Sequence, residues 1–454
     1  MSRSSVVILI DLKKRDLMGA SLIALHLEKL GIQAHLEPIE SWRSCIYAWK
    51  PDMIVFNHLL HRHVTALSAD LHRWGVLVGC LLNEGLALSE SQRTYLSEPQ
   101  YPDVHCDLFL AWNKPHEDRL RETALVSPPE NAVAVGVPRF DFYHHPWSSY
   151  YQRPRKSDRT SVLLNTTFAL SHFYERTPAE RETLYRSLGN GKIPEALDYN
   201  QMIDDHYQSR ARVVDYLQPL LASDRYDITL RPHPREDVAF YQRLVAGLPA
   251  GQRARIVIEA EDPVFSAILN HDIILNCEDC TTSAESWVAG KPTLTLTFTQ
   301  NPVFFTELYA SCSPQVNDPD ALIEAISHEL ANPEQTDFQK PRQAYLDKWL
   351  FKNDGQSSLR AAQEIQRVLQ EKKPAPRLPP SFSGTRRGLK VRFFRLFNEP
   401  GHTKFKHMIK RALAGDRGKM SIRYRDYLKA IRPGDVREAM SRLRAISEKA
   451  SSSE

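Results

Sequence analysis

The feature that most constrains the fold is an alternation of short apolar runs with longer amphipathic segments. Between the apolar runs of the first half lie segments with apolar residues at helical spacing, such as 19–29, which Gly31 would end. Strands that alternate with helices predict βαβ units and a mostly parallel sheet. The apolar runs that we expect to be strands are 6–10, 53–56, 76–82, 108–112 and 133–137.

The same alternation starts again in the second half of the chain, after a polar stretch at 149–158. Helices are expected at 202–221 and 237–248, and a crossover helix near 354–370. Two such halves predict the α/β class, with two facing Rossmann-like domains and a cleft between them. The strands expected here are 161–164, 226–230, 254–258, 271–276 and 293–297.

Charge divides the chain differently from the apolar pattern. Residues 371–454 contain 22 Lys and Arg against 8 Asp and Glu, whereas residues 1–370 contain 37 against 47. The Pro-rich stretch 372–380 separates the two regions, because it cannot form a continuous helix. We therefore expect a first domain at 1–155, a second at 156–370, and a basic, partly helical tail at 371–454.

Composition narrows the class of protein. Hydrophobic residues are 42% and charged residues 25% of the 454, as in soluble globular proteins. No apolar run reaches the roughly 18 residues of a membrane-spanning helix, and the first apolar run is too short for a secretory signal. The six cysteines have no regular spacing, so we predict no disulfide framework and a cytoplasmic location.

The polar cluster that most favours a binding site follows the expected strand 226–230. In Arg231-Pro232-His233-Pro234 the two prolines fix the backbone around a histidine, and Arg231 adds a permanent charge with fork geometry. Ligands of open α/β sheets bind beyond the carboxyl ends of the strands. We expect Arg231 and His233 to bind phosphate; the alternative is a stiff turn with solvated side chains.

A second polar cluster, CTTSAES, follows the expected strand 271–276. A Thr or Ser would cap the next helix, whose free N–H groups and hydroxyls form an anion site. Plain capping by Ser283 with an acidic first turn is the alternative. The residues that we assign to donor or phosphate binding with Arg231 and His233 are Thr281, Thr282, Ser283, Glu285 and Lys291.

The first half offers two candidate catalytic carboxylates. Glu84 follows the apolar run 76–82, where a base or nucleophile could act, and an ordinary turn residue is the alternative. Asp141 lies in the sequence GVPRFD with Arg139, and an internal Arg–Asp ion pair is the alternative there. With Asn165 and Thr166 at the end of the strand 161–164, Arg139 completes the residues that we expect to line the cleft.

Several patterns exclude other classes. The chain has neither a G-x-x-x-x-G-K-[ST] loop nor a G-x-G-x-x-G turn, which counts against P-loop kinases and NAD enzymes. Cys277 and Cys280 form a CxxC without a second pair at zinc spacing. His58, His61, His63 and the pair His144-His145 lack a carboxylate partner at metal-ligand spacing. We therefore predict no dedicated metal site, although a divalent metal is compatible with the expected chemistry.

With these residues in view, residues 6–370 resemble the bacterial surface carbohydrate biosynthesis protein family. That family is distantly similar to capsule β-Kdo transferases and CDP-glycerol glycerophosphotransferases. The resemblance implies a GT-B fold with a nucleotide-sugar in the C-terminal half, bound by His233, the hydroxyls of 281–283 and Glu285. Where such proteins often have a doubly acidic turn, this chain has Asn83-Glu84. The segments that carry the resemblance are ILIDLKKRDLMGASLIALHLEKLG, NEG, VGVPRFD, LLNTTF, LRPHPRED, CTTSAESWVAGKP and DGQSSLR.

We therefore predict a glycosyltransferase that moves a sugar from a nucleotide-activated, CMP-linked donor to a surface polysaccharide. The alternatives are a CDP-polyol phosphotransferase and a non-catalytic scaffold that binds glycan or nucleotide-sugar. In the tail, residues 386–411 interleave aromatic and basic side chains, which favours peripheral binding to an anionic membrane near a lipid-linked acceptor. Packing on the acidic body and binding of nucleic acid are the alternatives for this segment, and we expect no nucleic-acid partner.

Overall fold

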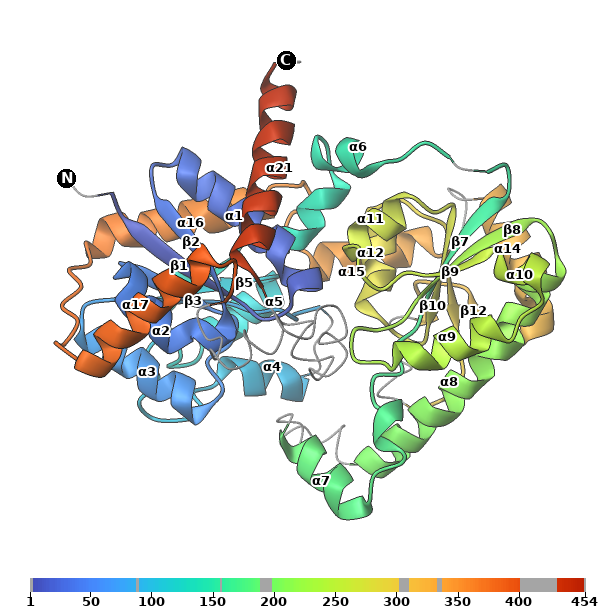
Figure 1. Cartoon of the computed structure of the whole chain (residues 1–454), viewed down its shortest axis with the longest axis horizontal. Helices are drawn as coiled ribbons and strands as arrows, with labels where there is room; N and C mark the ends of the chain where they lie inside the picture. Colours follow the sequence, from blue (N-terminus) through green and yellow to red (C-terminus); the bar gives the residue numbers. More distant parts are fainter. Residues whose placement is uncertain are drawn as a thin grey trace. The chain divides into compact units, whose positions relative to one another are not determined.

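A computed structural model describes the chain at residues 3–86, 90–155, 157–187, 198–301, 310–332, 337–400 and 431–452, without the side chains of 91 and 184–187. Contacts divide it into two units (Figure 1). Unit 1 contains Met1–Trp147 and Lys348–Glu454, and unit 2 is Ser148–Asp347.

Unit 1 is built on a parallel sheet with the strand order β2-β1-β3-β4-β5-β6. Apart from the edge strand β2, its strands are almost completely buried, as near-continuous apolar runs require. The strands are β1 (Ser5–Ile10), β2 (Gln33–Pro38), β3 (Met53–Phe56), β4 (Leu77–Leu81), β5 (Leu108–Ala111) and β6 (Ala132–Ala134). The helices that accompany them are α1 (Lys13–Lys29), α2 (Trp42–Trp49), α3 (Arg62–Arg73), α4 (Glu90–Ser97), α5 (Lys114–Arg121) and, after the sheet, η3 (Pro138–Tyr143).

Unit 2 is built on a second parallel sheet, with the order β12-β11-β10-β7-β8-β9. Numbered from β7, this is the 3-2-1-4-5-6 order of the Rossmann fold. The strands are β7 (Thr160–Asn165), β8 (Tyr226–Arg231), β9 (Ile256–Ile258), β10 (Ile273–Cys277), β11 (Thr293–Leu296) and β12 (Gln315–Val316). The helices include α6 (Trp147–Tyr151), α7 (Pro178–Ser187), α8 (Tyr199–Ala222), α9 (Val238–Ala246), α10 (Ala250–Arg253), α11 (Val264–Leu269), α12 (Thr281–Val288), α14 (Leu322–Ala331) and α15 (Gln339–Trp349).

The predicted α/β class with two Rossmann-like domains is confirmed by these two sheets. The apolar runs of the sequence become strands within a few residues of their expected bounds. The sequence pattern missed β2 and β12. Each is an edge strand with one neighbour, so its residues are less uniformly buried than those of the central strands.

The last part of the chain folds with unit 1, and this corrects the expected domain limits. Helix α16 (Ser357–Lys372), which we grouped with the second domain, packs on α1. The described parts of the basic tail are not separate either. Helix α17 (Phe382–Leu396) packs on α2, and α21 (Pro433–Ser451) packs on α1. The charge boundary near residue 370 is therefore not a structural boundary.

No helix within the described ranges is both long and apolar enough to cross a membrane.

Candidate functional site

Three polar side chains form a row across the carboxyl ends of the central strands of unit 2. Arg231 of β8 is in register with Asn165 of β7, which is in register with Asn276 of β10. Residues at one level of a parallel sheet point to the same side, and Asn165 Nδ2 donates to Asn276 Oδ1 at 2.9 Å. Register thus brings together residues from three distant parts of the sequence.

This row lies where the strand order reverses. From β7 the chain proceeds to β8 and β9 on one side, and then to β10, β11 and β12 on the other. At such a switch point the connections leave in opposite directions, and ligands of open α/β sheets bind there. Asn165 Oδ1 is buried and accepts no hydrogen bond from the described residues. A buried acceptor in this state calls for a donor, which an ordered water or a ligand would supply.

Helix α12 begins directly at this row. Thr282 Oγ1 donates to Asn276 Oδ1 at 2.9 Å, and Asn276 Nδ2 donates to Ser283 Oγ at 3.0 Å. The predicted Thr or Ser cap is wrong, because Cys280 occupies the N-cap position and its side chain makes no capping hydrogen bond. The hydroxyls instead fasten the helix start to the strand end, with its positive N-terminus at the carboxyl edge of the sheet.

The backbone of the RPHP segment is held by a buried carboxylate, Glu236. Its Oε1 accepts from Thr166 Oγ1 at 2.6 Å, from Phe168 N at 3.1 Å and from His233 N at 3.0 Å. The hydroxyl of Tyr241 donates to the other oxygen. Burial raises the pKa of Glu236, while these donors oppose the rise. Thr166 therefore supports the position of His233 through Glu236, and the His233 ring is only partly buried.

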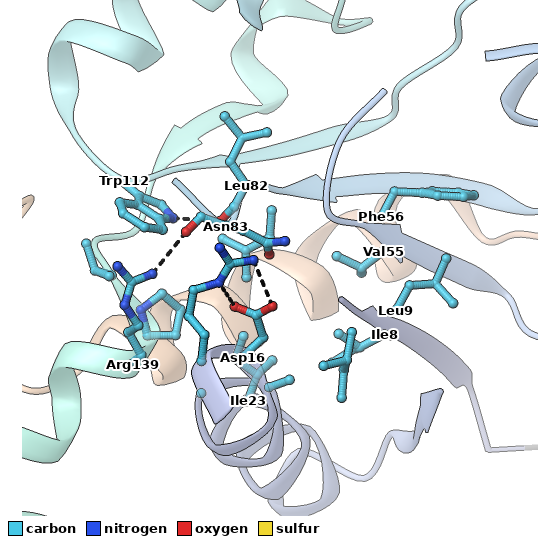
Figure 2. A pocket seen from close by; sticks show the side chains of 17 residues that line it. Ile8, Leu9, Asp16, Ile23, Val55, Phe56, Leu82, Asn83, Trp112 and Arg139 are labelled. Carbon is cyan, nitrogen blue, oxygen red and sulfur yellow. Dashed lines mark hydrogen bonds and ion pairs between the residues drawn. The ribbon is translucent and has the colours of Figure 1, made fainter. Parts of the chain in front are cut away.

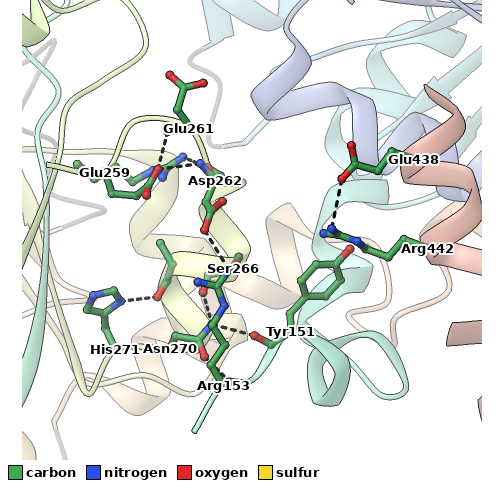
Figure 3. A network of polar contacts seen from close by, with 12 residues as sticks. Tyr151, Arg153, Glu259, Glu261, Asp262, Ser266, Asn270, His271, Glu438 and Arg442 are labelled. Carbon is green, nitrogen blue, oxygen red and sulfur yellow. Dashed lines mark hydrogen bonds and ion pairs between the residues drawn. The ribbon is translucent and has the colours of Figure 1, made fainter. Parts of the chain in front are cut away.

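Arg231 is positioned by the loop after β9. Its Nη2 donates to the Asp262 carbonyl at 2.6 Å. Arg153 in turn donates from Nη2 to Asp262 Oδ2 at 3.1 Å and from its backbone N to Asn270 Oδ1 at 2.6 Å (Figure 3). Glu259 accepts from the Asp262 N–H, which closes the loop. The guanidinium of Arg231 thus has a fixed place at the edge of the row.

A buried glutamate, Glu278, and a buried histidine, His206, lie beyond the row, and neither was predicted from the sequence. Glu278 Oε2 lies 3.9 Å from His206 Nε2, and Glu278 Oε1 accepts from Ser209 Oγ at 3.2 Å. Burial, with the charges of Asp205 and Asp279, raises the pKa of Glu278 to about 8. Burial and the nearby His233 lower the pKa of His206 to about 3. At neutral pH both groups are therefore uncharged.

Glu278 also has a strained backbone, with φ at +57°. A non-glycine residue in the left-handed region costs free energy and is frequent at functional sites. The signal available in the sequence was a Glu directly after a mostly apolar strand, in Asn276-Cys277-Glu278. We interpreted that segment only as a CxxC pair.

Lys291 lies at the opposite end of the sheet, so the prediction that it reaches the same anion is wrong. Its Nζ donates to the His271 carbonyl at 2.8 Å, and both residues precede the first residues of β11 and β10. Burial lowers the pKa of Lys291. Glu285, by contrast, is buried on α12, two residues after Ser283. Thr281 is the first residue of α12 and is partly exposed.

Unit 1 has a pocket of its own at its switch point, between β1 and β3. The carboxyl ends of β1, β3 and β4 form its apolar floor, and α1 supplies Arg15 and Asp16 (Figure 2). The Arg139 guanidinium lies 4.7 Å from the centre of the Trp112 ring and donates to the Asn83 carbonyl at 3.0 Å. Arg139 therefore lines this pocket.

Glu84 follows β4 beside this pocket, with 53% of its side chain exposed. Arg15 Nη1 donates to its Oε1 at 2.8 Å, and Arg15 Nε donates to Asp16 Oδ1 at 2.7 Å. The carboxylate is thus accessible and fixed in position, as a base requires.

Asp141 has a structural position instead. It is buried, and its two oxygens accept from the backbone N–H groups of Ser357 at 2.9 Å and Ser358 at 2.7 Å, at the start of α16. Gly136 has φ at +93°, and a side chain there would collide with Ser357. The segments VGVPRFD and DGQSSLR therefore join α16 to unit 1, and we no longer regard Asp141 as a base.

Within the described ranges, one group combines residue types that bind metals: His72, His105 and Asp107. Asp107 Oδ1 lies 2.6 Å from the Lys372 ammonium, and Oδ2 accepts from Val78 N at 2.8 Å. The lysine occupies the position that a cation would take, so we interpret the group as an ion-pair cluster that holds the end of α16.

No protein-family model and no curated protein sequence matches this chain. Solved structures resemble it at low identity. A Listeria monocytogenes protein proposed to be a UDP-N-acetylglucosamine 2-epimerase has 15% identity and a TM-score of 0.49, over 84% of this chain and all of its own. The wall teichoic acid polymerase TagF has 12% identity and a TM-score of 0.48, over 82% of this chain and 90% of its own.

A glycosyltransferase from Rickettsia africae has 11% identity and a TM-score of 0.44, over 82% of this chain and all of its own. We transfer no activity from such distant likenesses.

Proposed function

We propose that the chain is a transferase that moves a glycosyl group from a nucleotide-activated donor to a surface polysaccharide. The observation that carries the proposal is the row of Arg231, Asn165 and Asn276 at the switch point of unit 2, with the start of α12 fastened to it. Cation, amides and helix N-terminus converge at one strand edge, which is the chemistry that a donor phosphate needs.

The departing nucleotide gains negative charge on its phosphate as the glycosyl bond breaks. Arg231, His233 and the helix N-terminus would stabilise that charge, and fixed donors do so without reorganisation. Arg231 is held by the Asp262 carbonyl and His233 by Glu236, so both are supported in position before the ligand arrives.

Two further observations fit a nucleotide. The buried Asn165 Oδ1 suits a hydroxyl donor, such as one on a ribose. Glu278 is uncharged at neutral pH, so it does not repel a phosphate nearby as an ionised carboxylate would. A CMP-linked acidic sugar is the donor that we propose.

The acceptor hydroxyl needs a base, and we propose Glu84 for this role. It is the exposed carboxylate beside the pocket of unit 1, and Arg15 fixes its position. Arg139, whose guanidinium stacks on the buried Trp112 ring, lines that pocket and would offer a cation to an acceptor glycan. No residue in this assignment requires a metal, although a divalent ion could accompany the donor.

The proposal also places the protein at the inner surface of a membrane. The basic C-terminal region, with its net charge of +14, would bind anionic lipid beside a lipid-linked acceptor.

A thermal-shift panel with CMP-, CDP-, UDP- and GDP-linked donors tests the phosphate site. At a hundredfold excess over Kd, the bound donor should stabilise the protein by about 2.7 kcal/mol. We expect His233→Ala to lose this shift with little change in its unliganded Tm, because Glu236 bonds the backbone, and the bond of the ring, in which Nδ1 accepts from Arg235 N at 3.2 Å, is exposed to solvent. His328→Ala, on the exposed side of α14, is the matched control.

A full nucleotide shift in His233→Ala would refute the assignment of the RPHP segment. A response to CDP-polyols alone would favour polyol-phosphate transfer at the same site. Donor binding without any turnover would favour the non-catalytic scaffold.

A further inference from the structure

Helix α17 has one buried face and, opposite to it, one exposed face. Gly384, Gly388, Val391 and Phe394 are buried, and they pack on α2 (Figure 1). At about 100° per residue these four positions lie on one side of the helix. The other side therefore points away from unit 1.

Close contacts fix this orientation. A Cβ on Gly388 would lie 2.8 Å from the backbone carbonyl of Tyr47, so only glycine allows the helices to approach this far. Arg392 Nη2 donates to the Ala48 carbonyl at 2.7 Å, and Arg395 Nη1 donates to the buried Glu37 carboxylate at 2.7 Å. The helix cannot turn its outer face inward without breaking these bonds.

The outer face carries a stripe of exposed apolar side chains. Single exposed apolar residues need no explanation, but a cluster of them on one helix face does. Of the seven large hydrophobic side chains that are exposed in the described structure, five lie here. They are Phe382 (88% exposed), Leu389 (62%), Phe393 (47%), Leu396 (82%) and Phe397 (55%).

Basic side chains border this stripe, and acidic ones do not. On the helical wheel Arg386 lies between Phe393 and Phe397, and Lys390 lies at the edge beyond Phe397. Arg392, at the other edge, is bound to the Ala48 carbonyl, and residues 372–398 contain no Asp or Glu. Lys390 Nζ lies 5.3 Å from the centre of the Phe394 ring, which is buried on the inner face, so the lysine stem runs along the border between the two faces.

We propose that the outer face of α17, defined by these five apolar residues, docks on an anionic lipid bilayer. The apolar side chains enter the boundary between headgroups and acyl chains, while Arg386 and Lys390 bind lipid phosphates. This specifies the surface for the membrane association proposed above, and it rests on that association but not on the transfer chemistry.

Charge decides between a membrane and the other occupants. In a symmetric dimer each patch faces itself, so the basic borders of two copies would approach each other and repel. Nucleic acid would neutralise the borders but would leave the apolar centre without a partner. An anionic bilayer complements both the borders and the centre.

Point substitutions test the face better than truncation, because removing α17 would also uncover the apolar residues of α2. The full chain is sedimented with phosphatidylcholine vesicles, with and without phosphatidylglycerol. We expect binding only to the anionic vesicles, weakened by salt. The double variant Leu389→Ser/Phe393→Ser should lower the partition coefficient at least about tenfold, since two inserted side chains are lost.

Arg386→Glu/Lys390→Glu should also lower binding at least about tenfold and reduce its dependence on salt. Val257→Ser, which removes an exposed apolar residue of unit 2, is the matched control and should bind as the original chain does. Unchanged thermal unfolding and an unchanged nucleotide shift in every variant would show that fold and donor site are intact.

Equal vesicle binding by the two double variants and the original chain would overturn the proposal. A double variant that has a lower molar mass by light scattering but keeps its vesicle binding would also overturn the proposal, because the face would then join two copies of the chain. A failed nucleotide shift with normal vesicle binding would refute only the proposed function.

Discussion

The buried carboxyl of Glu278 gives a prediction whose size follows from the structure. Its pKa of about 8 lies well above the ordinary value of 4.5. At about 1.36 kcal/mol per pKa unit, ionising Glu278 in the folded protein therefore costs on the order of 4–5 kcal/mol more than in the unfolded chain. Between pH 4.5 and 8 the folded protein keeps a proton on Glu278 that the unfolded chain releases. The free energy of unfolding therefore falls as the pH rises through this range.

Glu278→Gln removes the ionisation and keeps an oxygen that can accept from Ser209. Below pH 4.5 the variant and the original chain should differ little, because Glu278 is protonated in both the folded and unfolded states. As the pH rises to 8 the variant should become more stable by at least about 2 kcal/mol, allowing for relaxation around the buried charge. For a unit of this size, that raises Tm by roughly 4–8 °C.

The assay is the difference in Tm between Glu278→Gln and the original chain, measured by scanning calorimetry from pH 5 to 8.5. Taking the difference cancels most groups that both proteins share, and His206 titrates below this range. Glu324→Gln, on the exposed side of α14, is the matched control and should show no trend. A difference that stays constant with pH would refute the neutral, buried state of Glu278.

Two further substitutions test the remaining assignments. Glu84→Gln should bind donor normally and turn over at least about a hundredfold more slowly. Glu90, another exposed glutamate paired with an arginine, gives the control Glu90→Gln, which should be unaffected. Near-normal turnover by Glu84→Gln would place the base elsewhere. Gly388→Ala should lower the free energy of unfolding by about 1–2 kcal/mol in urea, since its Cβ would lie 2.8 Å from the Tyr47 carbonyl. Gly251→Ala in α10, where nothing lies within 4 Å, should not be destabilising, and an equal loss there would contradict the packing argument.

The sequence determined most of the sheets because the central strands and most helices are specified by local patterns, whereas the edge strands β2 and β12 are not. An apolar run such as Met53–Phe56 is buried on both faces wherever it lies in a parallel sheet, and its bounds are readable within a few residues. Polar residues after such runs also mark the carboxyl edge, and Arg231 and Asn165 do lie there. Their position follows from the end of the strand and needs no knowledge of its neighbours.

Only the tertiary structure decided which of these residues meet. Register placed Asn276 beside Asn165, while Lys291, 15 residues further on, lies at the other end of the sheet because a helix intervenes. The sequence makes Asp141 a candidate base or nucleophile, but in the structure both of its oxygens accept from the start of α16. Periodicity and composition are properties of short windows, whereas hydrogen-bond partners and buried charges such as Glu278 depend on residues far apart in the chain.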